Sequence, residues 1–478
     1  MSKGVKNVFK TLTSIALAMI LCLNLALPAL ARDFASGGSD ASEPVEAALT
    51  KIFWMPINTP IPAATFNFTF TKVGMDYPLD NSLDAINKMP ALGSSNGTAG
   101  SISITYTGDA VAIPDNGTLI EDALEGDKYA VKQSANFLAG IPASAWGNGE
   151  GIYRYKVTEA DSSSISFYNT GTEYEVYSTA EYDVEVWVEE DENEVLYPRY
   201  VLVKIVTGKE DEYYVINGEP ANGKVDPTPD GEGIIPGSPT FGDDFSQVFF
   251  TNKYWKKDGD DTDPKKNALE IVKNTKGSGH DPNKYFPFKI TVTQPNVIPT
   301  TGAYPPAQSY KAYVIDAAGT VVNAAANGAT GPTDSLGRYF TFVSGVENTF
   351  EVNLKHGERL AFVDLHVGSA VAVKEPGDTN YKISYKRTFS STPSNKEFIA
   401  DEAGIEFGFP RTSGDPGPHF TLAGQNANIA TFINTRKGAS PMGIGVDDLP
   451  YIVLIGAALV SLAGFVVLVF RKKAKNNA

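Results

Sequence analysis

The feature that most constrains this chain is a strand-like run that occurs twice, once near the middle and once near the C-terminus. The first copy is Gln247-Val-Phe-Phe-Thr-Asn-Lys253, and the second is Ile429-Ala-Thr-Phe-Ile-Asn-Thr435. Both have the length and the β-branched and aromatic content of a β-strand, and both contain an asparagine near the end. A carboxamide in an apolar strand is costly unless it finds hydrogen-bond partners. The partners of these two asparagines therefore matter for function.

Other runs with strand character fill the chain between its two ends, and no helical period competes with them. Phe66–Phe70 and Tyr182–Val188 alternate between apolar and polar residues, which is typical of half-buried strands. The 44 Gly and 30 Pro indicate frequent turns. The order of segments in 45–256 is repeated in 265–437, so the repeating unit is a whole domain. We therefore predict an all-β chain of two tandem domains, preceded by a flexible leader at 32–45.

The composition restricts the partners of the chain. Its 56 acidic residues exceed its 40 basic ones, giving a formal charge of −16, which disfavours nucleic acid and anionic membrane surfaces. Between the domains, Lys257–Pro264 is rich in Asp and could hold calcium, but its EF-type pattern is incomplete. We expect a solvated linker there, and neither a metal nor a cofactor in the protein.

The N-terminal residues 1–31 have the pattern of a secretory signal peptide. Three lysines precede an apolar stretch, Leu12–Leu27, and Ala29-Leu-Ala31 forms a small-residue cleavage site. Cys22 is the only cysteine and lies inside this segment. The exported chain therefore has no disulfide, although its compartment would permit one, and any covalent cross-link must be of another kind.

The C-terminal segment 451–470 is apolar and uncharged, and its length of about 20 residues is enough to span a bilayer as a helix. The basic residues that follow place the tail, 471–478, in the cytoplasm by the positive-inside rule. They are Arg471, Lys472, Lys473 and Lys475. We therefore expect a membrane-anchored protein whose body lies outside the cell.

Three polar residue types recur in the same order in both domains, each time among apolar neighbours. Lys comes on the opening strand, Glu on a middle strand and Asn on the closing strand. In the first domain they are Lys51, Glu159 and Asn252, and in the second Lys273, Glu375 and Asn434.

This combination has a specific chemistry when it is buried. Desolvation lowers the pKa of a lysine and raises that of a carboxyl group. A neutral amine beside a carboxamide, with a carboxylic acid to polarise the carbonyl and move protons, is arranged for nucleophilic attack and loss of ammonia. The product is an intramolecular Lys–Asn isopeptide bond. An ordinary edge lysine, surface glutamate and strand-end asparagine explain one such set, but not two in the same order.

The motifs around these residues resemble the isopeptide-linkage domains of Gram-positive pilins, especially the streptococcal major-pilin type. The resemblance covers most of 45–437. It implies Ig-like β-sandwiches, Lys–Asn bonds between first and last strands, and Glu159 and Glu375 as catalytic acids, although Pro376 after Glu375 departs from the pattern. The motifs are Leu269-x-Ile-x-Lys273, Tyr155-Lys-Val-Thr-Glu159, Phe249-Phe-Thr-Asn252 and Thr431-Phe-Ile-Asn434. We expect His356 and Glu358, in a turn, to be structural.

The segment 438–450, the apolar span and the basic end together resemble a sortase sorting signal. Ser440-Pro-Met-Gly443 has methionine where such signals carry threonine, and the cut would fall between Met442 and Gly443. The resemblance implies sortase and other pilin subunits as partners, at the cell surface of a Gram-positive bacterium. Lys253, Lys256 and Lys257 are possible sites of linkage between subunits, on their expected exposure alone.

We therefore predict a structural surface protein, a pilin or pilin-like stalk, rather than an enzyme with turnover. The alternative is an adhesin in which loops 74–150 and 294–345 bind a glycan or a host protein, because loops on a rigid scaffold often carry recognition. Trp146 and Tyr153 could stack on a sugar or belong to the core. A secreted hydrolase is disfavoured, because there is no nucleophile elbow and no zinc-ligand spacing among four His.

Overall fold

The computed structural model describes most of the chain between the predicted signal peptide and the C-terminus. The described residues are 34–57, 59–93, 100–108, 117–122, 126–167, 172–206, 215–216, 219–220, 223–229, 245–299, 309–328, 331–388, 393–399, 404–407, 428–437 and 449–476. The predicted signal peptide, 1–31, and the predicted cleavage site at Met442 and Gly443 lie outside these residues.

The first domain has two main sheets. The larger has nine strands, in the order β1 (Phe34–Ser36), β12 (Leu196–Ile205), β11 (Glu181–Glu190), β8 (Gly151–Glu159), β3 (Ala63–Tyr77) and β4 (Leu79–Asp80), with β15 (Lys224–Val225) on β12, and β5 (Ser101–Thr107) and β9 (Ser164–Ile165) on β3. The other runs β10 (Glu173–Val176), β16 (Phe249–Asp258), β2 (Thr50–Pro56), β7 (Asp127–Gln133) and β6 (Thr118–Asp122). Smaller elements are α2 (Leu83–Asn87), η2 (Ala143–Ala145) and the ribbon β13 (Val215–Ile216) with β14 (Glu219–Pro220).

The second domain also has two sheets. The seven-stranded sheet runs β20 (Phe340–Val343), β19 (Ser309–Ile315), β23 (Arg359–Phe362), β17 (Leu269–Lys276), β29 (Asn428–Arg436), β26 (Tyr381–Thr388) and β27 (Pro393–Ile399). The five-stranded sheet runs β21 (Val346–Glu347), β18 (Phe286–Thr293), β25 (Ala370–Pro376) and β28 (Gly404–Phe407), with β22 (Val352–Leu354) on β18. A short helix, η3 (Ala325–Asn327), lies between β19 and β20.

The two sheets of each domain pack face to face through their aromatic side chains. In the first domain the rings of Phe68 and Phe250 have centroids 4.7 Å apart, and in the second those of Phe288 and Phe432 are 5.2 Å apart. The inward side chains of β11 are buried at every second position, as its alternating sequence predicts. The predicted all-β class, with two tandem β-sandwiches, is confirmed.

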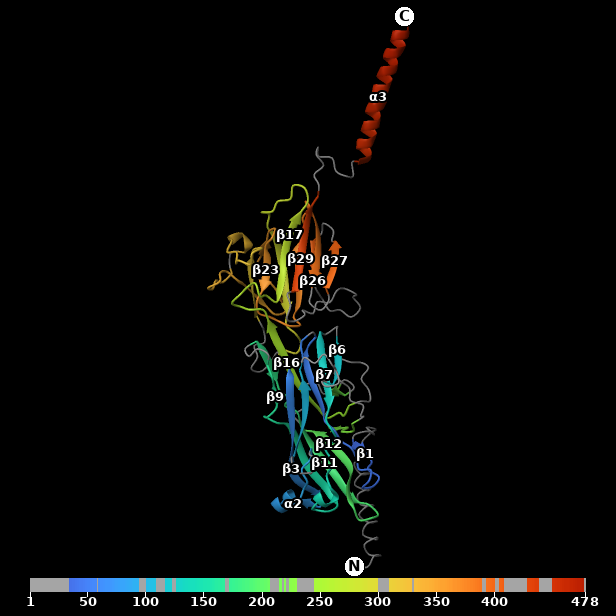
Figure 1. Ribbon diagram of the computed structural model, residues 1–478, viewed down its shortest axis with the longest axis vertical. Helices are drawn as coiled ribbons and strands as arrows, with labels where there is room; N and C mark the ends of the chain where they lie inside the picture. The colour runs from blue at the N-terminus through green and yellow to red at the C-terminus, as the bar shows by residue number, and fades with distance from the viewer. Residues whose placement is uncertain are drawn as a thin grey trace, which may run out of the picture.

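The two domains are joined by strand pairing rather than by a free linker. Lys257 and Asp258, at the end of β16, pair antiparallel with His366 and Leu365 of β24 (Leu365–His366) in the second domain. Two residues of the second domain's β18–β19 connection, 297–298, are buried in the core of the first. Figure 1 shows the domains stacked end to end along the long axis. The solvated linker that we predicted from residue 257 therefore begins only after β16.

The predicted leader and the acidic segment between the domains are both more ordered than we expected. The leader is not wholly flexible, because Phe34–Ser36 form β1 on β12 and Val45 is buried in the core. The acidic segment after β16 forms local turns in which the Asp260 carboxylate accepts hydrogen bonds from the backbone and hydroxyl of Thr262. Among the described residues, no group of three or more His, Cys, Asp or Glu side chains is placed to hold a metal ion.

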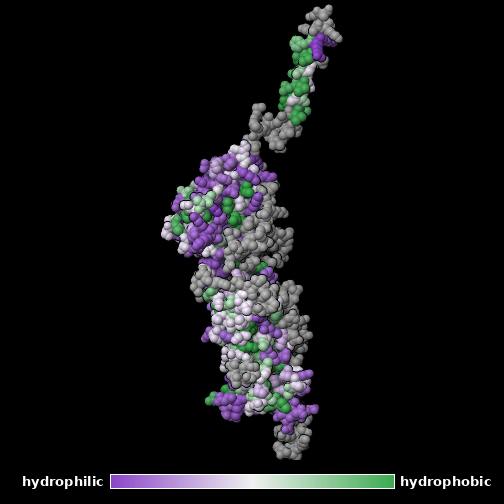
Figure 2. Space-filling view, viewed as in Figure 1, coloured by the Kyte–Doolittle hydropathy of each residue, from purple (hydrophilic) through white to green (hydrophobic). Residues whose placement is uncertain are grey.

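The C-terminal helix α3 (Leu449–Asn476) contains the predicted span 451–470. By length and composition, Val453–Lys472 is long and apolar enough to cross a membrane. Figure 1 shows α3 standing clear of both sandwiches, and Figure 2 shows its apolar side chains facing outward. Such a surface is unfavourable in water and fits an anchor.

Candidate functional site: a repeated Lys–Glu–Asn cluster

In each domain the opening and closing strands are direct neighbours in one sheet and run parallel. Lys51 on β2 pairs with Phe250 on β16, and Asn252 is two residues further along β16, opposite Phe53. Residues two apart on a strand share a face. Lys51 and Asn252 therefore both point into the sandwich, one pleat apart on adjacent strands.

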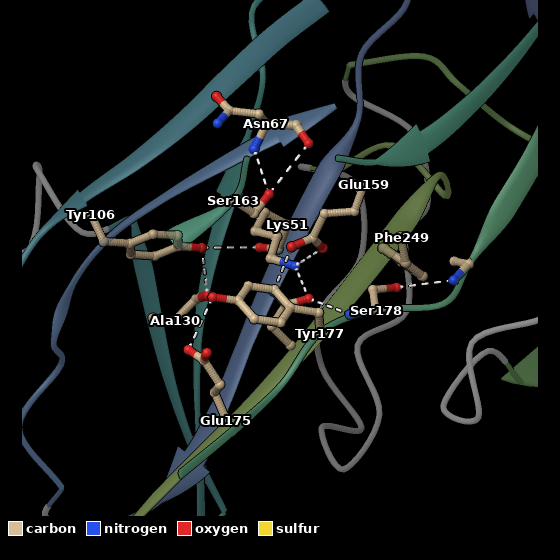
Figure 3. A network of polar contacts seen from close by, with 12 residues as sticks. Lys51, Asn67, Tyr106, Ala130, Glu159, Ser163, Glu175, Tyr177, Ser178 and Phe249 are labelled. Carbon is tan, nitrogen blue, oxygen red and sulfur yellow. Dashed lines mark hydrogen bonds and ion pairs between the residues drawn. The ribbon is translucent and has the colours of Figure 1, made fainter. Parts of the chain in front are cut away.

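The first site is closed by a carboxyl group from the opposing sheet. Glu159 is the last residue of β8, and its Oε2 lies 2.9 Å from Lys51 Nζ. Asn252 Nδ2 donates to Glu159 Oε1 at 2.7 Å, and Lys51 Nζ also donates to Asn252 Oδ1. Figure 3 shows the Lys51 amine at the centre of this network, with Glu159 reaching it from the facing sheet. Each of the three side chains contacts the other two.

Aromatic rings surround the Lys51 amine on its remaining side. Nζ lies 4.3 Å from the ring centroid of Phe66 and 5.9 Å from that of Phe68. Phe68 pairs with Glu159 in the register of β3 and β8, so the same strand pair supplies both the acid and the rings. The backbone is held by Tyr106, whose hydroxyl lies 3.2 Å from the carbonyl oxygen of Lys51. The lysine is fully buried, at 0% exposed.

The second domain repeats the strand register and the contacts of the acid with both partners, but Asn434 Oδ1 accepts no hydrogen bond from Lys273. On β17 and β29, Lys273 pairs with Phe432, and Asn434 is again two residues further along the parallel partner. Lys273 Nζ lies 2.8 and 2.9 Å from the two carboxylate oxygens of Glu375, and Asn434 Nδ2 donates to Glu375 Oε1 at 2.6 Å. Two phenylalanines again flank the amine, with Nζ 4.4 Å from the centroid of Phe286 and 5.8 Å from that of Phe288.

Burial controls the protonation of the second pair. It lowers the pKa of Lys273 to about 8, although the neighbouring Glu375 acts in the opposite direction. It also raises the pKa of Glu375, against the effects of Lys273 and of the hydrogen bond from Asn434. Both changes bring an uncharged amine beside an uncharged acid closer in free energy to the ion pair. That uncharged pair is the form that nucleophilic attack requires.

The two sites differ at the carboxamide oxygen. In the first domain, the backbone N–H of Ser178 donates to Asn252 Oδ1 at 2.7 Å. In the second, Asn434 Oδ1 is buried without a hydrogen-bond partner in the described part of the chain. Pro376, which departs from the pattern of the pilin domains, does not displace the catalytic acid that we predicted. It is the last residue of β25, and the Glu375 carboxylate still contacts Lys273.

The structure thus brings together all six residues that the sequence singled out, and it adds four that the sequence argument missed. They are Phe66, Phe68, Phe286 and Phe288, none of which was predicted to belong to a site. Their signal in the sequence was two phenylalanines two positions apart, Phe66-x-Phe68 and Phe286-x-Phe288, in the strand that follows the lysine strand in each domain. The isopeptide bonds themselves stay a prediction.

Other residues that we considered are placed differently from expectation. Lys253 and Lys256 are buried, at 6% and 5% exposed, so the prediction that they are exposed linkage sites is wrong. Their strand is covered on both faces. Lys257 is partly buried near Asp364.

Two pairs of residues turn out to be structural. Trp146 and Tyr153 are 1% and 0% exposed and pack edge to face, which places them in the core rather than on a sugar-binding surface. His356 Nδ1 accepts a hydrogen bond from the backbone of Thr275. The Glu358 carboxylate accepts one from the buried Asn327.

Comparison with known proteins gives one family match. Residues 267–436 match a family described as a domain of unknown function (DUF7601). No curated protein matches the chain.

Among solved structures, the chain is similar to the major pilin from Streptococcus pyogenes, with 16% identity and a TM-score of 0.27 over 82% of this chain and 99% of that one. The T-13 major pilin of the same species shows 16% identity and a TM-score of 0.25, over 85% and 99%. A pilus-presented adhesin shows 16% identity and a TM-score of 0.20, over 49% of this chain and 35% of that one.

Proposed function

We propose that this chain is a cell-surface structural protein, a pilin or pilin-like stalk, in which each sandwich is closed by an intramolecular Lys–Asn isopeptide bond. One observation carries the proposal: the same Lys–Glu–Asn cluster occurs once in each domain. In both domains the lysine and asparagine have the same parallel register, and two phenylalanines flank the amine. A buried charged cluster is not a good source of stability by itself. A reaction that removes its charges gives its repeated occurrence a physical reason.

The reaction balances within the side chains present. The uncharged Lys51 amine attacks Cγ of Asn252, and the electron pair of the carbonyl moves to Oδ1. The Glu159 carboxyl group receives the proton lost by the amine and protonates Nδ2, to which it is already hydrogen-bonded. The Cγ–Nδ2 bond then breaks, ammonia leaves, and a secondary amide joins the two strands. Lys273, Glu375 and Asn434 act in the same way. Each domain reacts once and nothing turns over.

The position of the bonds suits a protein that bears tension. Each bond would connect the closing strand of a sandwich to β2 or β17, which lie near the start of the two sandwiches. A force applied to the two ends of the chain would then pass through the covalent bond close to where it enters and leaves each sandwich. Closing so long a loop also removes freedom from the unfolded chain, worth about 5 kcal/mol by the same argument as for a disulfide. The expected consequences are slow unfolding and resistance to proteases.

The ends of the chain fit display at the cell surface. Helix α3 would anchor the protein in the membrane, with Arg471 and Lys472 on the cytoplasmic side. Cleavage by a sortase between Met442 and Gly443, and joining to other pilin subunits, are parts of the same proposal. The adhesin alternative rests on loops 74–150 and 294–345, and the two aromatic residues considered for stacking on a sugar, Trp146 and Tyr153, are in the core.

Tryptic peptide mapping of the full chain in detergent tests the proposal. We expect two branched peptides, one linking Lys51 to Asn252 and one linking Lys273 to Asn434, each lighter by one ammonia than its two components. Glu159→Gln keeps the size of the acid but cannot exchange the proton, so it should slow the first bond by about 10²–10⁴-fold and leave the second intact. Glu375→Gln should do the converse. Wild-type chain in which both lysines yield ordinary linear peptides would refute the proposal.

A further inference from the structure

The Asn252 carboxamide oxygen accepts hydrogen bonds from Lys51 Nζ and from the Ser178 backbone N–H, whereas the Asn434 oxygen accepts neither kind among the described residues. The contact with Ser178 depends on strand length. β10 pairs antiparallel with β16, from Glu173 opposite Lys256 to Val176 opposite Lys253. The ladder stops there, one position before Asn252. The backbone beyond Val176 is therefore released from strand pairing beside the carboxamide. Its N–H groups need other partners, since buried backbone donors are almost always satisfied.

The partner of the Ser178 N–H is the carboxamide of Asn252, the group that the amine attacks. It donates to Asn252 Oδ1 at 2.7 Å, while the Ser178 hydroxyl is engaged separately with the backbone N–H of Ala180 at 3.2 Å. Figure 3 shows the Tyr177 ring between Ser178 and Glu175. The Tyr177 hydroxyl is held by Glu175, at 3.0 Å, so the segment is fixed on both sides of its donor.

Asn252 Oδ1 is the atom on which negative charge develops. When the amine adds to Cγ, the carbonyl electron pair moves to this oxygen. A preorganised donor 2.7–3.1 Å from such an atom lowers the barrier, because its interaction strengthens as the charge grows. The water-excluded surroundings of Lys51 increase that effect.

The second domain cannot supply the same donor from the corresponding place. The strand beside β29 is β26, and it pairs without interruption past the asparagine, with Ile383 opposite Asn434 and Tyr381 opposite Arg436. Asn434 Oδ1 has no partner among the residues that the structure describes.

Resting on the proposed isopeptide chemistry, we propose that the Ser178 backbone N–H is a catalytic group of the first site. It stabilises the oxyanion on Asn252 Oδ1, and the first domain consequently closes its bond before the second. The side chain of Ser178 is not required. The hydrogen bond from Ser178 forms because β10 ends before Asn252, and a longer β10 would abolish it.

The test is the rate of bond formation in each domain of the same full-length chain. Chain kept unfolded in denaturant from synthesis onward is diluted into folding buffer with detergent, quenched at intervals, and digested. The fractions of branched Lys51–Asn252 and Lys273–Asn434 peptides are then followed. Three chains are compared with wild type: Ser178→Ala, which keeps the N–H, Ser178→Pro, which lacks it, and a chain with an ester in place of the amide at Ser178. The ester changes one atom and is the deciding variant if the proline disturbs folding.

We expect wild-type chain to complete the first bond before the second. Ser178→Ala should react at the wild-type rate. The ester should slow the first bond by about 10²-fold without changing the second. An ester chain that forms the first bond at the wild-type rate would overturn the proposed role of Ser178. Absence of both branched peptides from wild type would instead overturn the isopeptide proposal itself, so the two failures are distinguishable.

Discussion

Lys51 and Asn252 lie on adjacent parallel strands, two register positions apart and on the same face, although 201 residues separate them in the chain. Lys273 and Asn434 stand in the same relationship in the second domain. In both cases a glutamate from the opposing sheet bonds to the two side chains at once. This arrangement joins the opening and closing strands of each sandwich at one buried point.

Replacing one of the two lysines with methionine, which has a similar volume but no amine, should prevent bond formation in that domain only. In Lys51→Met the first bond cannot form, and the free energy of unfolding of the first domain should fall by about 5 kcal/mol, because the unfolded chain regains the freedom of the open loop. Lys273→Met should do the same for the second domain. Denaturant unfolding with limited trypsin digestion measures both. A first domain as protease-resistant in Lys51→Met as in wild type would contradict the assigned role of Lys51.

Bond formation in the second domain should depend on pH with two limbs. The reactive uncharged pair holds the same number of protons as the ion pair, so its fraction is constant while Lys273 and Glu375 share one proton. Below that range both groups are protonated and the amine cannot attack. Above about pH 8, the pKa to which burial lowers Lys273, the pair loses its proton and with it the acid. Folding chain from denaturant across pH 4–10 should therefore give a rate plateau that falls on both sides. A rate that keeps rising above pH 9 would contradict the need for a protonated Glu375.

The phenylalanine beside the amine should matter through the exclusion of water. In Phe286→Ala, water can reach Lys273 and move its pKa toward the ordinary value of about 10.4, leaving about 10²-fold less neutral amine. The second bond should form more slowly by roughly that factor. Phe342→Ala is the matched control, since Phe342 is buried in the same core and its ring packs against Phe350 and Phe362. Equal slowing in both variants would show that loose packing, not hydration of the amine, is responsible.

A third Lys–Glu–Asn set in the second domain should not react. Asn327 Nδ2 donates to Glu358 at 2.7 Å, and Lys355 Nζ lies 3.8 Å from the same carboxylate. The lysine side chain, however, is 33% exposed, so water stabilises its ammonium form and leaves little nucleophile. Peptide mapping should find Lys355 in linear peptides only. A branched Lys355–Asn327 peptide would contradict the claim that burial selects the reactive lysines.

Much of this site could be predicted from the sequence because its residues violate local rules. Lysine and asparagine in the middle of apolar strands need a reason, and the repetition of a whole domain supplied the alignment that paired Lys51 with Lys273 and Asn252 with Asn434. The all-β class followed from period-two alternation in segments such as Tyr182–Val188.

The remainder depends on strand neighbours, which alternation does not specify. Nothing local indicates that β2 lies beside β16 and runs parallel to it, or that β10 ends one position before Asn252 and frees the Ser178 N–H. The exposure of Lys253 and Lys256 was predicted wrongly for a related reason: charge suggested a surface, but β16 is covered on both faces. Likewise the acidic residues after Trp255 suggested a solvated linker, although the end of β16 pairs with a strand of the second domain.

The most direct test of the central claim is the intact mass of the full-length chain, purified in detergent and compared with a Lys51→Met, Lys273→Met double variant whose N-terminus is processed identically. The account predicts that wild type is lighter than its sequence by two ammonia molecules, and that the double variant has the mass of its sequence. A wild-type mass equal to that of the unreacted sequence would contradict the account.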